Sequence, residues 1–142
     1  MSMNVQSDNQ FLILNSISRQ TTAVVIEDMP TVGNLAAILL TRMGFKVISF
    51  ETGESACTWF ESNSADIILC DIMLPEMSGE EVLERLRQLP HLRDVPIIAV
   101  TALALGRDRE RLLGLGFTDY IAKPVSSATF IQHVKSLLVQ NA

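Results

Sequence analysis

Short apolar runs alternate with longer amphipathic stretches along most of the chain. Five runs rich in β-branched and aromatic residues predict strands, at residues 23–26, 45–50, 66–70, 96–100 and 117–122. After each run, apolar residues recur at three- and four-residue spacing, which predicts helices at about residues 32–43, 52–62, 78–89, 105–113 and 126–139. The chain is therefore expected to repeat a strand–helix unit five times.

Individual residues define the ends and the buried faces of these helices. Ser78 is a suitable N-cap, and the two glutamates that follow it favour the positive end of a helix. Gly44 is expected to stop the first helix, and Gly114 and Gly116 the fourth. Val32, Leu35, Ile38, Leu39 and Met43 recur at helical spacing and predict the first helix.

Repeated strand–helix units require right-handed crossovers, and these build a parallel sheet with helices on both faces. The run at 66–70 has the continuous hydrophobicity of a strand that is covered on both sides. The sequence thus predicts an α/β fold of the (βα)₅ type. In such sheets ligands bind beyond the carboxyl ends of the strands, so polar residues at those ends are the candidates for a site.

Composition narrows the class of protein. A chain of 142 residues with 48% hydrophobic residues fits one domain with a proper core. The net charge of −5 argues against a nucleic-acid-binding surface. Cys57 and Cys70 lack metal-ligand spacing and are expected to be reduced core residues, while His91 and His133 are expected to be exposed or half-packed without partners. No signal peptide or membrane span is visible, so a cytoplasmic location is expected.

The N-terminal residues differ from the rest in pattern. The stretch MSMNVQSDNQ is polar and aperiodic, and residues 1–21 are expected to form a flexible arm ahead of a single domain at 22–142. Within the arm, FLILNSIS could form an extra strand or a helical turn that docks on the domain or on a partner. The sequence leaves both alternatives open.

Polar side chains follow four of the five predicted strands. Glu27 and Asp28 follow the first, Asp71 the third, Thr101 the fourth and Lys123 the fifth. Any one of them alone is more often a cap, a turn former or a solvated charge. Because parallel strands end at one edge of the sheet, we expect the five side chains to lie close together.

This set of residues suggests a specific chemistry. Three crowded carboxylates need a counter-ion, and hard oxygen ligands suit Mg²⁺. A carboxylate beside that cation can attack a phosphoryl group and form an acyl phosphate, with Asp71 as the natural nucleophile. Thr101 would donate a hydrogen bond and Lys123 a positive charge to the phosphoryl oxygens.

Four motifs, VVIEDMP, IILCDIMLPEMSGEEVLERLR, PIIAVTALA and GFTDYIAKPV, together resemble the receiver domain of two-component response regulators, over roughly residues 22–139. The resemblance implies a flavodoxin-like, doubly wound (βα)₅ fold, a three-layer sandwich with a parallel five-stranded sheet of order 2-1-3-4-5. It also implies that Asp71 is phosphorylated, that Asp28 ligates Mg²⁺ directly and that Glu27 acts through the metal shell. The backbone carbonyl of Met73 would complete the protein ligands.

The resemblance assigns further roles around the phosphoryl group. Thr101 and Lys123 would bind it, and Tyr120 would turn inward together with Thr101 on phosphorylation. The Lys123–Pro124 peptide bond is expected to be cis, and Gly79 to let the loop after Asp71 turn tightly. Glu27 departs from the more frequent aspartate, which leaves oxygen ligation intact.

The resemblance implies a response regulator rather than an enzyme acting on other molecules, since it would catalyse only its own phosphorylation and dephosphorylation. The phosphodonor would be a histidine kinase or a phosphotransfer protein. A downstream protein would bind the face made by the fourth helix, the fifth strand and the fifth helix, without direct contact to nucleic acid or membrane. The alternative is a receiver-like interaction module that works without phosphorylation, against which the intact acid, Thr and Lys set counts.

Two other classes fit the sequence less well. A flavodoxin-like FMN carrier needs a phosphate-cradling loop after the first strand, where this chain has the acidic EDMPTVG. An aspartate-nucleophile phosphatase needs a second Asp two residues after the nucleophile, and Met73 cannot carry a proton. Turnover of external phosphate esters is therefore disfavoured.

Overall fold

The computed structural model describes residues 21–102 and 106–140, and its centre is a five-stranded parallel sheet. The strands are β1 (Thr22–Ile26), β2 (Lys46–Phe50), β3 (Ile67–Asp71), β4 (Ile97–Thr101) and β5 (Asp119–Ala122). Their order in the sheet is β2-β1-β3-β4-β5, and every neighbouring pair runs parallel. The predicted doubly wound, flavodoxin-like (βα)₅ topology is confirmed.

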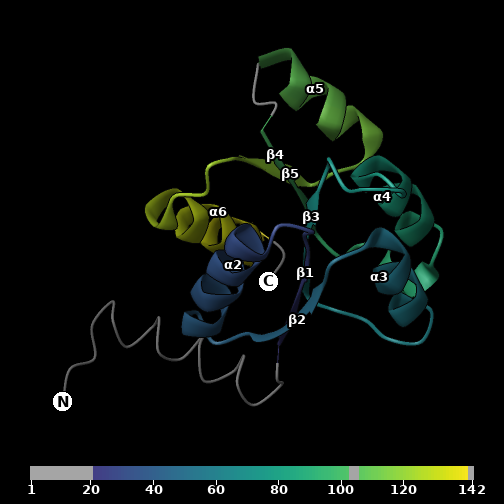
Figure 1. Cartoon of the computed structure of the whole chain (residues 1–142), viewed down its shortest axis with the longest axis horizontal. Coiled ribbons are helices and arrows are strands. Elements are labelled where there is room, and N and C mark those ends of the chain that lie inside the picture. The colour runs from purple at the N-terminus through teal and green to yellow at the C-terminus, as the bar shows by residue number, and fades with distance from the viewer. Residues whose placement is uncertain (1–20, 103–105, 141–142) are drawn as a thin grey trace.

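Helices connect the strands and cover both faces of the sheet (Figure 1). They are α2 (Pro30–Arg42), α3 (Gly53–Phe60), α4 (Gly79–Arg87), α5 (Gly106–Leu115) and α6 (Ser127–Gln140), with a 3₁₀ turn η1 (Pro90–Leu92) after α4. The helices α2 and α6 pack on one face through one buried cluster, and α3, α4 and α5 pack on the other through a second. The molecule is thus the three-layer sandwich that the sequence predicted.

The start of α4 is fixed by the residues that the sequence indicated. The Ser78 hydroxyl accepts a hydrogen bond from the Glu81 backbone N–H at 3.2 Å, and the Glu81 carboxylate accepts one from the Ser78 N–H at 3.4 Å. This reciprocal pair is a capping box, which satisfies two donors at the helix N-terminus. It holds α4 directly after the loop that leaves Asp71.

The apolar residues that recur at helical spacing in α2 are not all buried. Leu35 is 36% and Ile38 49% exposed, whereas the residues of α2 that face the sheet are Ala36, Leu39 and Leu40. The sequence of α2 is apolar on more than one side, so residue spacing alone does not determine which side packs on the sheet. An aliphatic pair is therefore left on the surface of α2.

Other element boundaries shift by small amounts. Gly114 lies inside α5, and the helix ends instead before Gly116, whose φ of +119° is a backbone conformation that favours glycine. The turn η1 was not predicted. None of the helices among the described residues is long and apolar enough to cross a bilayer. The arm assigned to residues 1–21, apart from Thr21, lies outside the described residues.

Candidate functional site

The pairing of β1 with β3 places the acids that follow these two strands next to each other. Ile26 of β1 is paired with Cys70 of β3, so the next residues along the two strands, Glu27 and Asp71, lie side by side. Asp28 follows Glu27 as the chain leaves β1. Neighbouring parallel strands thereby bring three carboxylates together although they lie far apart in the sequence.

The register of the next two strands adds the hydroxyl and the ammonium group. Asp71 is paired with Val100, so Thr101 lies one residue further along β4. Thr101 is in turn paired with Ala122, and Lys123 is the residue after it. From β3 to β5, each strand therefore carries its polar residue one position further along the strand direction. The ammonium of Lys123 reaches back to the Asp71 carboxylate at the end of β3. The Lys123–Pro124 peptide bond there is cis, as expected.

Asp71 is almost completely buried, with 2% of its surface exposed, and both of its carboxylate oxygens accept hydrogen bonds. Oδ1 accepts from the backbone N–H of Met73 at 3.0 Å, and Oδ2 accepts from Nζ of Lys123 at 3.0 Å. The backbone at Asp71 packs against Gly79, where a Cβ would contact the Asp71 carbonyl oxygen and approach Cα of Ile72 to 2.8 Å. The expected tight approach of the loop to Gly79 is confirmed.

Lys123 bridges two of the carboxylates. Its Nζ lies 3.0 Å from an oxygen of Glu27 and 3.0 Å from one of Asp71. Burial alone would lower the pKa of Lys123, but its hydrogen bonds to the two carboxylates outweigh this and raise the pKa above its ordinary value. The ammonium therefore stays charged at neutral pH. Its pairing with Glu27 was not predicted from the sequence.

The surroundings of Glu27 disfavour its charged form, whereas those of Lys123 favour its charged form. Burial raises its pKa to about 7, the neighbouring Asp71 adds to the rise, and the hydrogen bonds from Lys123 and from the Met29 N–H only partly oppose it. The ionised carboxylate of Glu27 therefore lies next to negatively charged Asp71, and Lys123 does not fully neutralise the two charges. A further cation bound at this position would stabilise the ionised form of Glu27.

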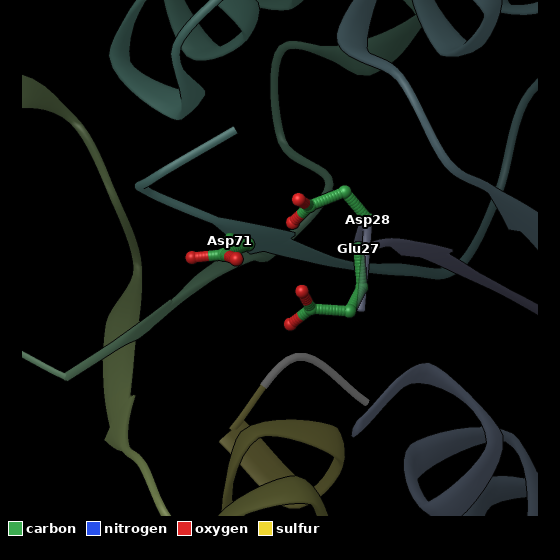
Figure 2. A group of neighbouring side chains, drawn as sticks. All are labelled: Glu27, Asp28 and Asp71. Carbon is green, nitrogen blue, oxygen red and sulfur yellow. The ribbon is translucent and has the colours of Figure 1, made fainter. Parts of the chain in front are cut away.

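The three carboxylates form a group that could hold a metal ion. One oxygen each from Glu27, Asp28 and Asp71 lies within 4.8 Å of the others. Figure 2 shows Glu27 and Asp28 leaving the end of β1 with their carboxylates turned toward Asp71. Since one ammonium faces three carboxylates, two negative charges remain uncompensated when all are ionised, which a divalent cation with oxygen preference such as Mg²⁺ would balance.

The remaining predicted site residues lie around this group. Thr101 is buried, with 1% of its surface exposed, and its carbonyl accepts the Lys123 N–H at 2.8 Å. The side chain of Met73 is 64% exposed beside the acidic group. Tyr120 is half-buried and packs against the hydrophobic cluster that α3, α4 and α5 share with the sheet. Leu103, which follows Thr101 by two residues in the sequence, lies outside the described residues.

The sequence predicted no site role for the cysteines or for His91. Cys57 and Cys70 are free, buried thiols, and burial raises the pKa of both. His91, however, is not without partners, since its Nε2 contacts the carbonyls of Phe60 at 2.8 Å and Asn63 at 3.1 Å. The expectation was wrong because these contacts join segments that no local pattern relates.

Comparison with known proteins identifies the family. The sequence profile of the response regulator receiver domain matches residues 23–135. The chain is 38% identical over 117 residues to the polar-differentiation response regulator DivK of Brucella ovis, covering 82% of this chain and 95% of DivK. It is 39% identical over 104 residues to the signal transduction histidine-protein kinase BarA of Shigella flexneri, covering 73% of this chain but only 11% of the kinase.

A solved structure agrees with these sequence matches. The receiver domain of the sensor histidine kinase PA1611 from Pseudomonas aeruginosa superposes with a TM-score of 0.74 at 33% identity, covering 82% of this chain and 95% of that one. That structure is described with a magnesium ion coordinated in its active site cleft. The architecture is therefore shared with a receiver domain.

Proposed function

The chain belongs to the response regulator receiver domain family, and we propose that its described domain accepts a phosphoryl group on Asp71 in a Mg²⁺-dependent reaction and thereby switches the binding of a partner protein. The observation that carries this proposal is the position of Asp71. Its carboxylate is buried between Lys123 and two further carboxylates, at the carboxyl end of the central strand. Three carboxylates gathered at one end of the sheet, with the pKa of Glu27 raised by burial and by Asp71, are better explained by chemistry than by stability.

The donor set suits the metal. Asp28 and Asp71 would ligate Mg²⁺ through carboxylate oxygens, Glu27 would act through its outer shell, and the backbone carbonyl of Met73 would complete the protein ligands. When bound, the cation would neutralise the acids and the charge on an incoming phosphoryl group. The magnesium described in the PA1611 receiver supports this assignment by analogy.

The chain's own residues would carry the transfer. A carboxylate oxygen of Asp71 attacks the phosphorus of the donor, a new O–P bond forms, and the donor's P–N or P–O bond breaks, with the electron pair leaving on the donor. Lys123, already 3.0 Å from Asp71, moves its ammonium group a short way to a phosphoryl oxygen. The hydroxyl of Thr101 donates a hydrogen bond to another oxygen. The domain acts on itself only.

The direct test is incubation with acetyl phosphate. With Mg²⁺ we expect the intact mass to rise by one phosphoryl group, with hydroxylamine removing the label as it does from an acyl phosphate. With excess EDTA the acidic group repels the donor, and labelling should fall at least about 10²-fold. Equal labelling with and without EDTA would refute the metal-dependent mechanism. No labelling under any condition would favour a receiver-like module that works without phosphorylation.

The partners in this proposal follow from the family. A histidine kinase or a phosphotransfer protein would supply the phosphoryl group, in the cytoplasm, and a downstream protein would bind the face of α5, β5 and α6. No direct contact with nucleic acid or membrane is part of the proposal. Residues 22–142 would form the receiver unit, with residues 1–21 as an arm.

Phosphorylation should change that face through Thr101 and Tyr120. A phosphoryl oxygen draws the Thr101 hydroxyl toward Asp71, and the half-buried ring of Tyr120 then turns into the space that is vacated. We expect NMR shift changes on α5, β5 and α6 after addition of beryllofluoride and Mg²⁺, a stable mimic of the phosphoryl group. Changes confined to residues next to Asp71 would contradict the switch.

The lifetime of the phosphorylated form should depend on two apolar positions, Met73 and Leu103. Neither side chain can orient a water molecule for in-line attack on the acyl phosphate, and such assistance is typically worth about 10²-fold or more. We expect Met73→Asn combined with Leu103→Glu to hasten dephosphorylation, measured as loss of the label after donor removal in excess Mg²⁺. A double variant that decays no faster than the parent would show that these positions do not control water access.

A further inference from the structure

Glu27 and Asp28 leave the end of β1 toward opposite faces of the sheet. Successive residues of an extended chain alternate between the two faces, and Figure 2 shows the two carboxylates on opposite sides of β1. The Glu27 side is that of α2 and α6, because Glu27 lines a small pocket together with Ala36 and Phe130 of these helices. The two neighbouring acids therefore approach Asp71 from different directions.

Both carboxylate oxygens of Glu27 have a partner. Oε2 accepts a hydrogen bond from the Met29 N–H at 3.1 Å, and Oε1 lies 3.0 Å from Nζ of Lys123. The aliphatic part of the side chain packs against α2, since a Cβ added at Gly33 would lie 3.6 Å from Cγ of Glu27. Only 4% of the Glu27 side chain and 15% of the Lys123 side chain are exposed, so solvent screens this ion pair weakly. Glu27 is therefore held in one position and directs one oxygen at Lys123.

Transfer of a phosphoryl group to Asp71 requires Lys123 to change partners. In the structure its Nζ lies 3.0 Å from Oδ2 of Asp71. When Asp71 attacks a donor such as acetyl phosphate, an acyl O–P bond forms, the donor's P–O bond breaks and the electron pair leaves with acetate. The ammonium keeps its protons and exchanges its contact with Asp71 for one with a phosphoryl oxygen. A second, fixed partner would keep the ammonium in place during this exchange.

We propose that Glu27 is a positioning residue for Lys123. Its carboxylate holds the ammonium beside Asp71 before the transfer and against the phosphoryl oxygen during it. This inference rests on the proposed phosphorylation of Asp71. The positioning role depends on the length of the Glu27 side chain, whereas a role in the metal shell alone would depend on its charge. The two roles therefore predict opposite orders of activity for two conservative variants.

Glu27→Asp keeps the charge but shortens the side chain by one C–C bond, roughly 1.5 Å, which takes the 3.0 Å contact with Lys123 beyond hydrogen-bond distance. Glu27→Gln keeps the length, and its amide oxygen can still accept from Nζ. At saturating Mg²⁺ we expect labelling by acetyl phosphate to slow about tenfold for Glu27→Asp and less for Glu27→Gln, because a displacement of about 1 Å in a catalytic group is costly. Mg²⁺ affinity, measured by calorimetry, should instead fall more for Glu27→Gln. The matched control is Glu84→Asp, the same change at an exposed position of α4, which should label like the parent.

A double-variant cycle with Lys123→Met tests whether Glu27 acts through Lys123. In that background Glu27→Asp should cause no further loss of rate at saturating Mg²⁺, because no ammonium remains to be positioned. The unfolding free energies of the same four proteins in EDTA, from urea unfolding, should also be non-additive, since the two side chains are in contact. Additive effects in either cycle, or slower labelling of Glu27→Gln than of Glu27→Asp, would overturn the inference and leave the proposed function intact. A parent protein that is never labelled would overturn both.

Discussion

Asp71→Asn is expected to abolish phosphoryl acceptance while the domain stays folded. An amide of nearly the same shape replaces the carboxylate, but it lacks the negative charge and nucleophilicity that the attack needs. Removing a nucleophile outright costs up to about 10⁶ in rate in other enzymes, so labelling by acetyl phosphate and Mg²⁺ should fall at least about 10⁴-fold. The measurement is the intact mass over time. The matched control is Asp94→Asn, an exposed acid that should label like the parent.

The fold should tolerate this substitution because the site is crowded with negative charge. Lys123 keeps Glu27 as a partner at 3.0 Å, and the loss of the Asp71 charge removes one of the causes that raise the pKa of Glu27. We therefore expect thermal unfolding in EDTA at no lower temperature than for the parent. Labelling of Asp71→Asn at the parent's rate would place the acceptor elsewhere, and an unfolded variant would contradict the electrostatic description of the site.

The sheet and the site were predictable for the same reason. Runs such as residues 66–70 are apolar without interruption, and a following acid is then conspicuous. Once the strands are parallel, Glu27, Asp71, Thr101 and Lys123 must all leave the same edge, and the register of the sheet confirms that they do. The topology makes residues that are far apart in the sequence into neighbours. The pattern of apolar runs is therefore sufficient to predict the sheet and the residues of the site.

What the sequence did not predict depends on packing between elements. Leu35 and Ile38 satisfy helical spacing as well as Leu39 does, and only the placement of α2 on the sheet separates them. The contacts of His91 with two carbonyls and the bridge from Lys123 to Glu27 likewise join distant segments. No residue type or spacing encodes such pairs, because each is set by the distance between elements after folding.

Two glycine-to-alanine substitutions should have opposite effects on stability. At Gly79 an added Cβ would contact the carbonyl oxygen of Asp71 and approach Cα of Ile72 to 2.8 Å, and both are backbone atoms that cannot rotate away. At Gly114, inside α5 and exposed, nothing lies within 4 Å of an added Cβ. The two variants therefore test the same added methyl group, once where backbone atoms leave no space for it and once where the space is empty.

Overpacking against backbone costs about 1–3 kcal/mol and sometimes more, and since neither the loop nor α4 can shift freely we expect Gly79→Ala to lose about 3 kcal/mol of unfolding free energy. Gly114→Ala should instead gain about 1 kcal/mol, because alanine restricts the unfolded chain and favours the helix interior. Urea unfolding followed by circular dichroism measures both. Displacement of the Asp71 backbone should also slow labelling of Gly79→Ala by acetyl phosphate, whereas Gly114→Ala should label normally. A Gly79→Ala variant as stable as the parent would mean that the loop between Asp71 and α4 yields easily, and that the close approach is not what holds Asp71 in place.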